Sequence, residues 1–108
     1  MSVARRIVRA TAGFFEDLDR QLGSERGPNG EPSTNDFQVH ELLRIVDRFA
    51  TEFDDLPELI PGRHDYRLLI AAGLLVPAYS VIGQLAPDRA VELVQLDIDH
   101  DLGWKDQS

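Results

Sequence analysis

The feature of this chain that most constrains its fold is a stretch from Leu68 to Pro87 that carries no charged side chain. A helix that spans a bilayer needs about 20 apolar residues, so a membrane helix is one interpretation of this stretch. However, Gly73, Pro77 and Gly83 interrupt it, and both residue types disfavour a continuous helix. Buried strands also read as short apolar runs bounded by such residues. The stretch therefore predicts two buried strands rather than a membrane span.

The composition predicts a single globular domain, residues 1–108, in a reducing compartment. The chain has 108 residues, of which 43% are hydrophobic and 28% charged, a balance typical of a chain that buries one core. It has no cysteine, which excludes disulfides and thiolate zinc sites and favours the cytoplasm. Lysine and arginine number 11 against 19 acidic residues, and the net charge of -8 argues against direct nucleic-acid binding.

An amphipathic helix is expected near the start of the chain. Arg5–Ala10 reads as a short strand near a sheet edge, and Thr11 can cap the helix that follows it. Gly23 is placed to end this helix in a left-handed conformation. The apolar residues of the helix recur at every fourth position, at Phe14, Leu18 and Leu22.

A second helix is expected after a polar segment. The range 23–36 is rich in turn-forming residues and predicts a mobile loop. Asn35 or Asp36 can cap the next helix, because Gln38 follows Asn35 at the spacing of a capping box. Pro57 ends this helix. Its apolar side chains form one stripe, made of Val39, Leu42, Leu43, Val46, Phe49, Ala50 and Phe53.

Three strands fit the rest of the chain, at Tyr66–Ala71, Val76–Ile82 and Val91–Ile98. The connections between them are short, so we expect them to be antiparallel neighbours. The predicted fold class is α+β, with a small antiparallel sheet of about four strands and two N-terminal helices packed on one face. The predicted order of elements is β-α-α-β-β-β.

The acidic end of the chain does not predict a metal or a cofactor. Asp97, Asp99 and Asp101 alternate like the first ligands of a calcium loop. Such a loop needs a glycine where Leu102 stands and a glutamate where Ser108 stands. These three carboxylates therefore predict a solvated strand end.

The histidines do not predict a zinc site. His40, His64 and His100 lack the spacing that places two imidazoles on one metal ion. Aspartates flank His100 on both sides, which makes it a candidate general acid, with an ordinary surface histidine as the alternative.

Two segments carry a resemblance to a known family. These are RRIVRATAGFFEDLDRQL near the start and DYRLLIAAGLLVPAYSVIGQLAPDRAVELVQLDIDHD near the end. Together with the order of the expected elements, they look like the RelE/ParE superfamily of bacterial toxins. Tyr66 and Arg67 open a strand, Tyr79 lies on the next one, and VELVQLDIDHD stands where the family usually has an apolar strand that ends in a His-Arg pair.

This resemblance implies a toxin of a type II toxin-antitoxin module, either a ribosome-dependent ribonuclease or a gyrase poison. Several positions depart from the ribonuclease pattern. Val76 stands where a second strand arginine is expected, Asp101 follows His100 where arginine is usual, and Trp104 replaces a terminal tyrosine. Because RNA cleavage needs cations that stabilise charge on the phosphate, messenger RNA cleavage is not favoured over gyrase-type poisoning.

The resemblance also implies a set of site residues and partners. The catalytic candidates are Arg67, His100 and Trp104, and the binding candidates are Arg63, Arg67, Tyr79 and Trp104. The expected partners are a cognate antitoxin, a protein target such as gyrase, and a second copy of the chain. The alternative hypothesis is a non-toxic intracellular domain of the same fold that binds or regulates another protein.

Overall fold

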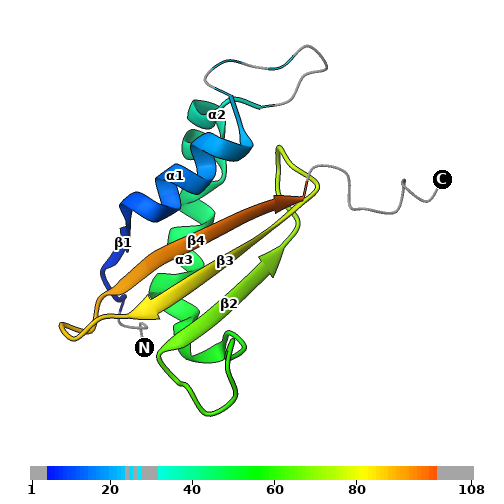
Figure 1. Ribbon diagram of the computed structural model, residues 1–108. Helices are drawn as coiled ribbons and strands as arrows, with labels where there is room; N and C mark the ends of the chain where they lie inside the picture. The colour runs from blue at the N-terminus through cyan, green and yellow to red at the C-terminus, as the bar shows by residue number, and fades with distance from the viewer. Residues whose placement is uncertain (1–4, 24, 26, 28–31, 100–108) are drawn as a thin grey trace.

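The computed structural model describes residues 5–23, 25, 27 and 32–99 (Figure 1). The elements, in chain order, are β1 (Val8–Ala10), α1 (Ala12–Gln21), α2 (Thr34–His40), α3 (Leu42–Glu52), the 3₁₀ turn η1 (Phe53–Asp55), β2 (Tyr66–Ala71), β3 (Ala78–Leu85) and β4 (Val91–Asp99). Three helices pack with a four-stranded sheet, so the predicted α+β class is confirmed.

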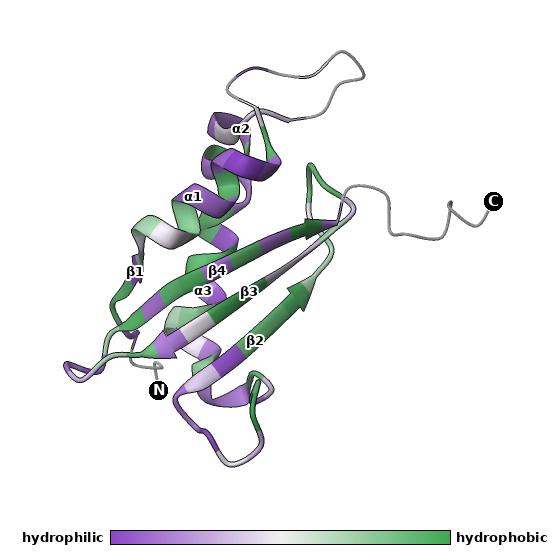
Figure 2. Cartoon of the chain, viewed as in Figure 1, coloured by the Kyte–Doolittle hydropathy of each residue, from purple (hydrophilic) through white to green (hydrophobic). Residues whose placement is uncertain are grey.

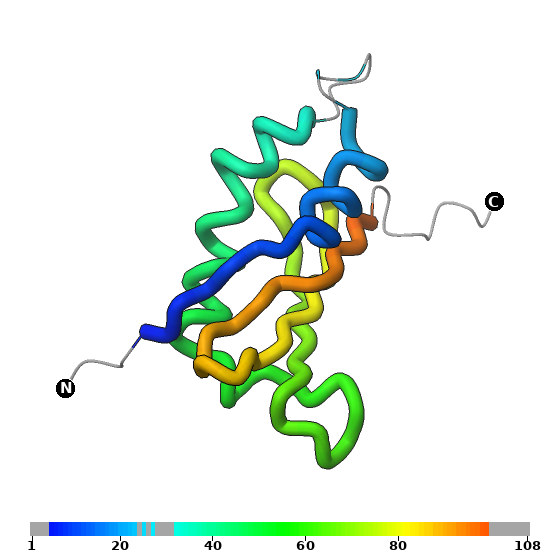
Figure 3. The backbone as a smooth tube through the Cα atoms, turned by 60° about the vertical axis from the view of Figure 1, so that its left-hand side comes forward, coloured from blue at the N-terminus to red at the C-terminus, as the bar shows by residue number. Residues whose placement is uncertain are grey.

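The sheet has four strands in the order β1-β4-β3-β2. β2, β3 and β4 are antiparallel neighbours, as their short connections predict. β1 pairs with β4 in parallel, so the sheet is mixed and not purely antiparallel as expected. The physical reason is that β1 has no short turn to its neighbour: the whole helical segment and two strands separate it from β4, and Figure 3 shows the two strands side by side.

The uncharged stretch Leu68–Pro87 contributes to two strands and not to a helix. β2 has the predicted bounds, whereas β3 begins at Ala78, later than predicted, and continues to Leu85. Within the part of the chain that the structure describes, no helix is long and apolar enough to cross a membrane.

Thr11 fixes the start of α1 against the sheet. Its hydroxyl accepts a hydrogen bond from the Phe14 amide at 3.3 Å, which confirms the predicted cap, and donates to the Leu93 carbonyl at 2.9 Å. The prediction for the other end is wrong, because α1 ends at Leu22 in an extended conformation and Gly23 has no positive φ. The Leu22 amide still donates to the Leu18 carbonyl, so an extended residue closes the helix without glycine.

The second predicted helix is in fact two, α2 and α3, which meet at Glu41. Its cap is Ser33, not Asn35 or Asp36: the Ser33 hydroxyl accepts from the Asp36 amide, and the Asp36 carboxylate accepts from the Ser33 amide. The helix therefore starts inside the predicted loop 23–36. The positions 24, 26 and 28–31 of that loop lie outside the described residues.

The buried stripe of these helices differs from the predicted one. A four-residue spacing connects the buried positions Phe37, Glu41, Ile45, Phe49 and Phe53, and Ala50 is buried beside them. Phe49, Ala50 and Phe53 are thus buried as predicted. Val39 and Leu43, which the prediction placed in the stripe, are exposed. A glutamate in the middle of the buried face explains the error, because a charged residue reads as a solvent position.

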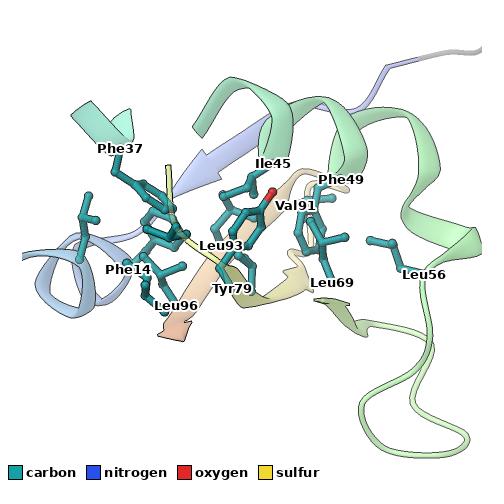
Figure 4. Close-up of a cluster of buried hydrophobic side chains, with 14 of the residues drawn as sticks. Phe14, Phe37, Ile45, Phe49, Leu56, Leu69, Tyr79, Val91, Leu93 and Leu96 are labelled. Atoms are coloured by element: carbon teal, nitrogen blue, oxygen red, sulfur yellow. The ribbon is translucent and has the colours of Figure 1, made fainter. Parts of the chain in front are cut away.

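The core lies between the helices and one face of the sheet (Figure 4). Phe14 and Leu18 come from α1, Phe37 from α2, and Ile45 and Phe49 from α3. The sheet side is built by alternate residues of β2, β3 and β4, namely Leu69, Tyr79, Val81, Val91, Leu93, Leu96 and Ile98.

Candidate functional site

The other face of the sheet is not covered by a helix (Figure 1). It consists of the residues that alternate with the core residues along the three long strands. We call these residues the open face: Tyr66, Leu68, Ile70, Ala78, Ser80, Ile82, Gln84, Glu92, Gln95, Asp97 and Asp99.

The open face changes from apolar to acidic across the strands. One cross-strand row runs from Leu68 through Ile82 to Gln95, and the next runs from Ile70 through Ser80 to Asp97. The apolar side chains lie toward β2, which Figure 2 shows as largely hydrophobic, and the acids lie on β4. Ile70 is 69% exposed. The surface therefore offers an apolar strip with carboxylates along one side.

A shallow hollow of about 200 Å³ lies on this face between the ends of the strands. Ile70 and Ala78 supply apolar walls, and Ser80, Asp97 and Asp99 supply polar ones. The outer backbone edge of β2 is partly closed beside it, because the Leu59 amide donates to the Tyr66 carbonyl and the Leu68 amide donates to the Pro57 carbonyl. A partner would accordingly meet the side chains of this face rather than a long free strand edge.

Arg67, the first predicted site residue, points to the covered face and is almost completely buried. Its guanidinium donates to the carbonyl oxygens of His64, Asp54 and Leu56 at 2.9, 3.0 and 2.8 Å. It also lies 5.4 Å from the centre of the Phe53 ring. These contacts connect η1 to β2, so Arg67 has a structural role that leaves few donors for a ligand.

Arg63, in contrast, lies at the border of the open face. Its guanidinium carbon is 4.8 Å from the centre of the Tyr66 ring and a terminal nitrogen is 3.0 Å from the Asp65 carboxylate. The hydrogen bond to Asp65 raises the pKa of Arg63 and lowers that of Asp65. Both groups stay charged, and Arg63 covers one side of Tyr66.

Tyr79 belongs to the core on the covered face. Its ring packs edge-on against Phe37 with ring centres 6.1 Å apart. Burial raises the pKa of Tyr79, and the negative charge of Glu41 adds to this effect. The structure therefore separates the side chains of Tyr79 and Arg67 from that of Arg63, so these three described members of the predicted binding set do not share one surface.

The remaining predicted residues are only partly described. His100, Asp101 and Trp104 lie outside the described residues. Asp97 and Asp99 are two residues apart on β4, and both lie on the open face. Among residues 5–23, 25, 27 and 32–99, no three metal-ligating side chains gather in a way that could hold an ion.

Glu41 is a feature that the sequence did not reveal. It is fully buried where α2 meets α3, and one carboxylate oxygen accepts a hydrogen bond from the Leu75 amide at 2.7 Å. Its other oxygen, Oε1, has no hydrogen-bond partner within the described structure. Glu41 thus fastens the loop between β2 and β3 to the helices.

A larger hollow, of about 540 Å³, lies at the C-terminal end of α3. We call it the Arg89 hollow, because Arg89 reaches it from the turn between β3 and β4. The charged side chains in its wall are Arg5, Arg6, Glu52, Asp54, Asp55 and Arg89. Only a turn signal at Pro87-Asp88 points to this region in the sequence.

Comparison of the chain with known proteins finds no matching family model, no matching curated protein and no matching solved structure.

Proposed function

We propose that this chain is the toxin-like component of a type II toxin-antitoxin module, and that it acts by binding a protein target rather than by cutting RNA. Gyrase is the kind of target that the sequence resemblance favours. A cognate antitoxin would neutralise the chain by covering the open face. The single observation that carries this proposal is an uncovered sheet face with an apolar strip at Leu68, Ile70 and Ile82.

An exposed apolar strip supports protein binding on energetic grounds. Complete burial of one isoleucine or leucine side chain contributes roughly 1.5–3 kcal/mol relative to leaving it exposed. Ile70 is 69% exposed, so a partner that buries its side chain would gain most of this free energy. Large contiguous apolar patches on a protein surface mark interaction sites.

The charges beside the strip define the chemistry of the partner. Asp97 has no ion pair in the part of the chain that the structure describes, and the whole chain carries a net charge of -8. Complementary potentials speed association and reject wrong partners. We therefore propose that the occupant is an antitoxin segment that alternates apolar side chains with lysine or arginine.

The same charges argue against RNA cleavage. Arg67, the cation among the catalytic candidates that the resemblance implies, is buried among carbonyl oxygens. Arg63 is paired with Asp65. An acidic row on β4 would repel a phosphate backbone, because such binding depends on clustered positive charge.

A second candidate function keeps the surface without the toxicity. In this alternative the chain is an intracellular protein-binding or regulatory domain. The position of Arg67 favours this alternative. Its guanidinium connects η1 to β2 through carbonyl oxygens, so it stabilises the fold rather than contacting a target.

Two variants that each replace one exposed isoleucine by lysine test the proposal. Ile70 lies on the open face and Ile7 lies just before β1, and both are 69% exposed. We expect that inducing the chain without an antitoxin stops growth, that Ile70→Lys restores growth, and that Ile7→Lys does not. Circular dichroism of each purified variant establishes that the fold is retained.

Each other result has a defined meaning. Normal growth in the presence of folded parent protein would exclude toxicity, and copurification of one basic protein in that case would favour the regulatory alternative. Equal behaviour of Ile70→Lys and Ile7→Lys would remove the open face from the proposal. Shortening of messenger RNA on induction would contradict the claim that no RNA is cut.

A further inference from the structure

Arg89 adopts a backbone conformation that is unfavourable for any residue except glycine. Its φ is +72°, and it is the one non-glycine residue with a positive φ in the described part of the chain. Two backbone hydrogen bonds close the turn: the Arg89 amide donates to the Ala86 carbonyl, and the Ala86 amide donates to the Ala90 carbonyl, each at 2.8 Å. A left-handed conformation costs an L-residue roughly 1–2 kcal/mol. The local structure alone would thus prefer glycine here.

The guanidinium of Arg89 also has no partner among the residues that the structure describes. Most arginines that the structure describes are paired, for example Arg9 with Asp88 and Arg48 with Glu52. Arg44 and Arg89 are the described arginines whose side chains have no hydrogen bond, ion pair or ring contact. An unpaired cation in a chain of 19 acidic residues has its donors available.

Two further cations, Arg5 and Arg6, line the Arg89 hollow together with Arg89. Arg5 is held by Asp47 at 2.9 Å, and Arg6 is held by Asp54 at 3.1 Å. Arg6 also lies 5.4 Å from the centre of the Phe53 ring, which forms an apolar part of the wall. A hollow of about 540 Å³ is within the size range of small-molecule sites.

We infer that the Arg89 hollow binds a carboxylate, with the Arg89 guanidinium as the group that receives it. Guanidinium and carboxylate match as a planar, bidentate pair. Glu52, Asp54 and Asp55 share the same wall, and their repulsion acts on each negative charge of a ligand. A singly charged carboxylate therefore fits this wall better than a doubly charged phosphate. This site is independent of the open face and goes beyond the proposed function.

The experiment titrates the ¹⁵N-labelled full chain with sodium acetate, a singly charged carboxylate, against sodium chloride of equal ionic strength. We expect saturable shifts of the amide signals of residues 52–55 and 89–90. Arg89→Gly removes the guanidinium and suits the turn, so it folds, and it should weaken binding by at least about tenfold, the loss of one charge-assisted hydrogen bond. Arg44→Ala, the matched control, removes the other unpaired guanidinium and should leave binding unchanged.

Two further arms identify the ligand. A capped peptide with a single glutamate that binds more tightly than acetate would assign the carboxylate to a partner protein, and the reverse order would assign it to a small molecule; either result supports the site. Tighter binding of inorganic phosphate than of acetate would overturn the carboxylate assignment. Absence of saturable shifts in the parent, or equal weakening in Arg89→Gly and Arg44→Ala, would overturn the site itself.

Discussion

The ring of Phe49 lies directly over Gly83, in the space that a Cβ atom on Gly83 would occupy. Phe49 is completely buried, and the register of β3 against β4 shifts at Ile82 and Gly83. The glycine thus lets α3 approach the sheet closely. We expect Gly83→Ala to lower the free energy of unfolding by about 1–3 kcal/mol through overpacking, measured by urea denaturation.

Gly13→Ala is the control for this change. A Cβ atom on Gly13 would meet its nearest neighbour, the Val94 carbonyl, at 3.4 Å, which is an ordinary contact. Alanine also has a higher helix propensity than glycine, so this variant should not lose stability. An equal loss in both variants would mean that the close approach at Gly83 has no special role.

The elements can be predicted where local chemistry decides them. The sequence predicts Tyr66–Ala71 with its observed bounds and Thr11 as a cap, because breakers and side-chain acceptors act over a few residues. The parallel pairing of β1 with β4 cannot be predicted in this way. It depends on contacts between distant segments, which no short pattern contains.

The candidate site can be predicted less well, because a residue type does not show which way its side chain points. Arg67 and Arg63 look alike in the sequence, yet one is buried among carbonyl oxygens and the other borders the open face. Glu41 and Arg89 break local rules, one as a buried acid and one as a left-handed arginine. Residues that break local rules are the ones that sequence patterns miss.

Arg67 should be essential for stability and not replaceable by lysine. Its guanidinium donates to three carbonyl oxygens in different directions, which an ammonium on a shorter, flexible stem cannot reproduce. Loss of a hydrogen bond that involves a charged group costs about 1.5–3 kcal/mol. We expect Arg67→Lys to lower the free energy of unfolding by about that amount.

Arg63→Lys is the matched control for Arg67→Lys. The Arg63 ion pair is exposed, and pairs of this kind contribute about 0–1 kcal/mol. Its urea midpoint should stay close to that of the parent. A stable Arg67→Lys variant would show that the guanidinium is not needed for folding.

Asp17 should make stability depend on acid pH. Burial raises the pKa of its carboxyl, but the Leu96 amide and the Arg20 guanidinium outweigh burial and hold the pKa below its ordinary value of 3.8. A depressed pKa stabilises the folded state above the unfolded value, and that contribution is lost as the pH falls through the folded value.

The expected result is a loss of stability below about pH 4 that is smaller in Asp17→Asn than in the parent, with the variant less stable at neutral pH. Urea midpoints between pH 2.5 and 7 measure this. Asp19→Asn removes the same charge from the exposed side of α1 and controls for net charge. Parallel pH profiles for the parent and Asp17→Asn would contradict the assignment.

Glu41 should be replaceable by glutamine but not by alanine. Glutamine keeps a carbonyl oxygen that can accept from the Leu75 amide, and it removes a carboxylate whose Oε1 has no partner in the described structure. Alanine leaves that buried amide unpaired and adds a cavity, at a cost of about 2–4 kcal/mol. Urea denaturation should therefore place Glu41→Gln near the parent and Glu41→Ala well below it. A loss of stability in Glu41→Gln as large as that in Glu41→Ala would show that the carboxylate charge is required.

Replacing Arg89 by glycine should stabilise the fold but weaken binding of a carboxylate. Glycine adopts the left-handed conformation without steric cost, so Arg89→Gly should raise the free energy of unfolding by about 1 kcal/mol. Gly62→Ala is the mirror control: Gly62 has a φ of +88°, and a Cβ atom added to it would meet no other atom within 4 Å, so alanine there should destabilise through the backbone alone. Thermal denaturation of both variants tests the pair. A less stable Arg89→Gly would show that the arginine side chain stabilises its own turn, and the conformational cost could then no longer be assigned to ligand binding.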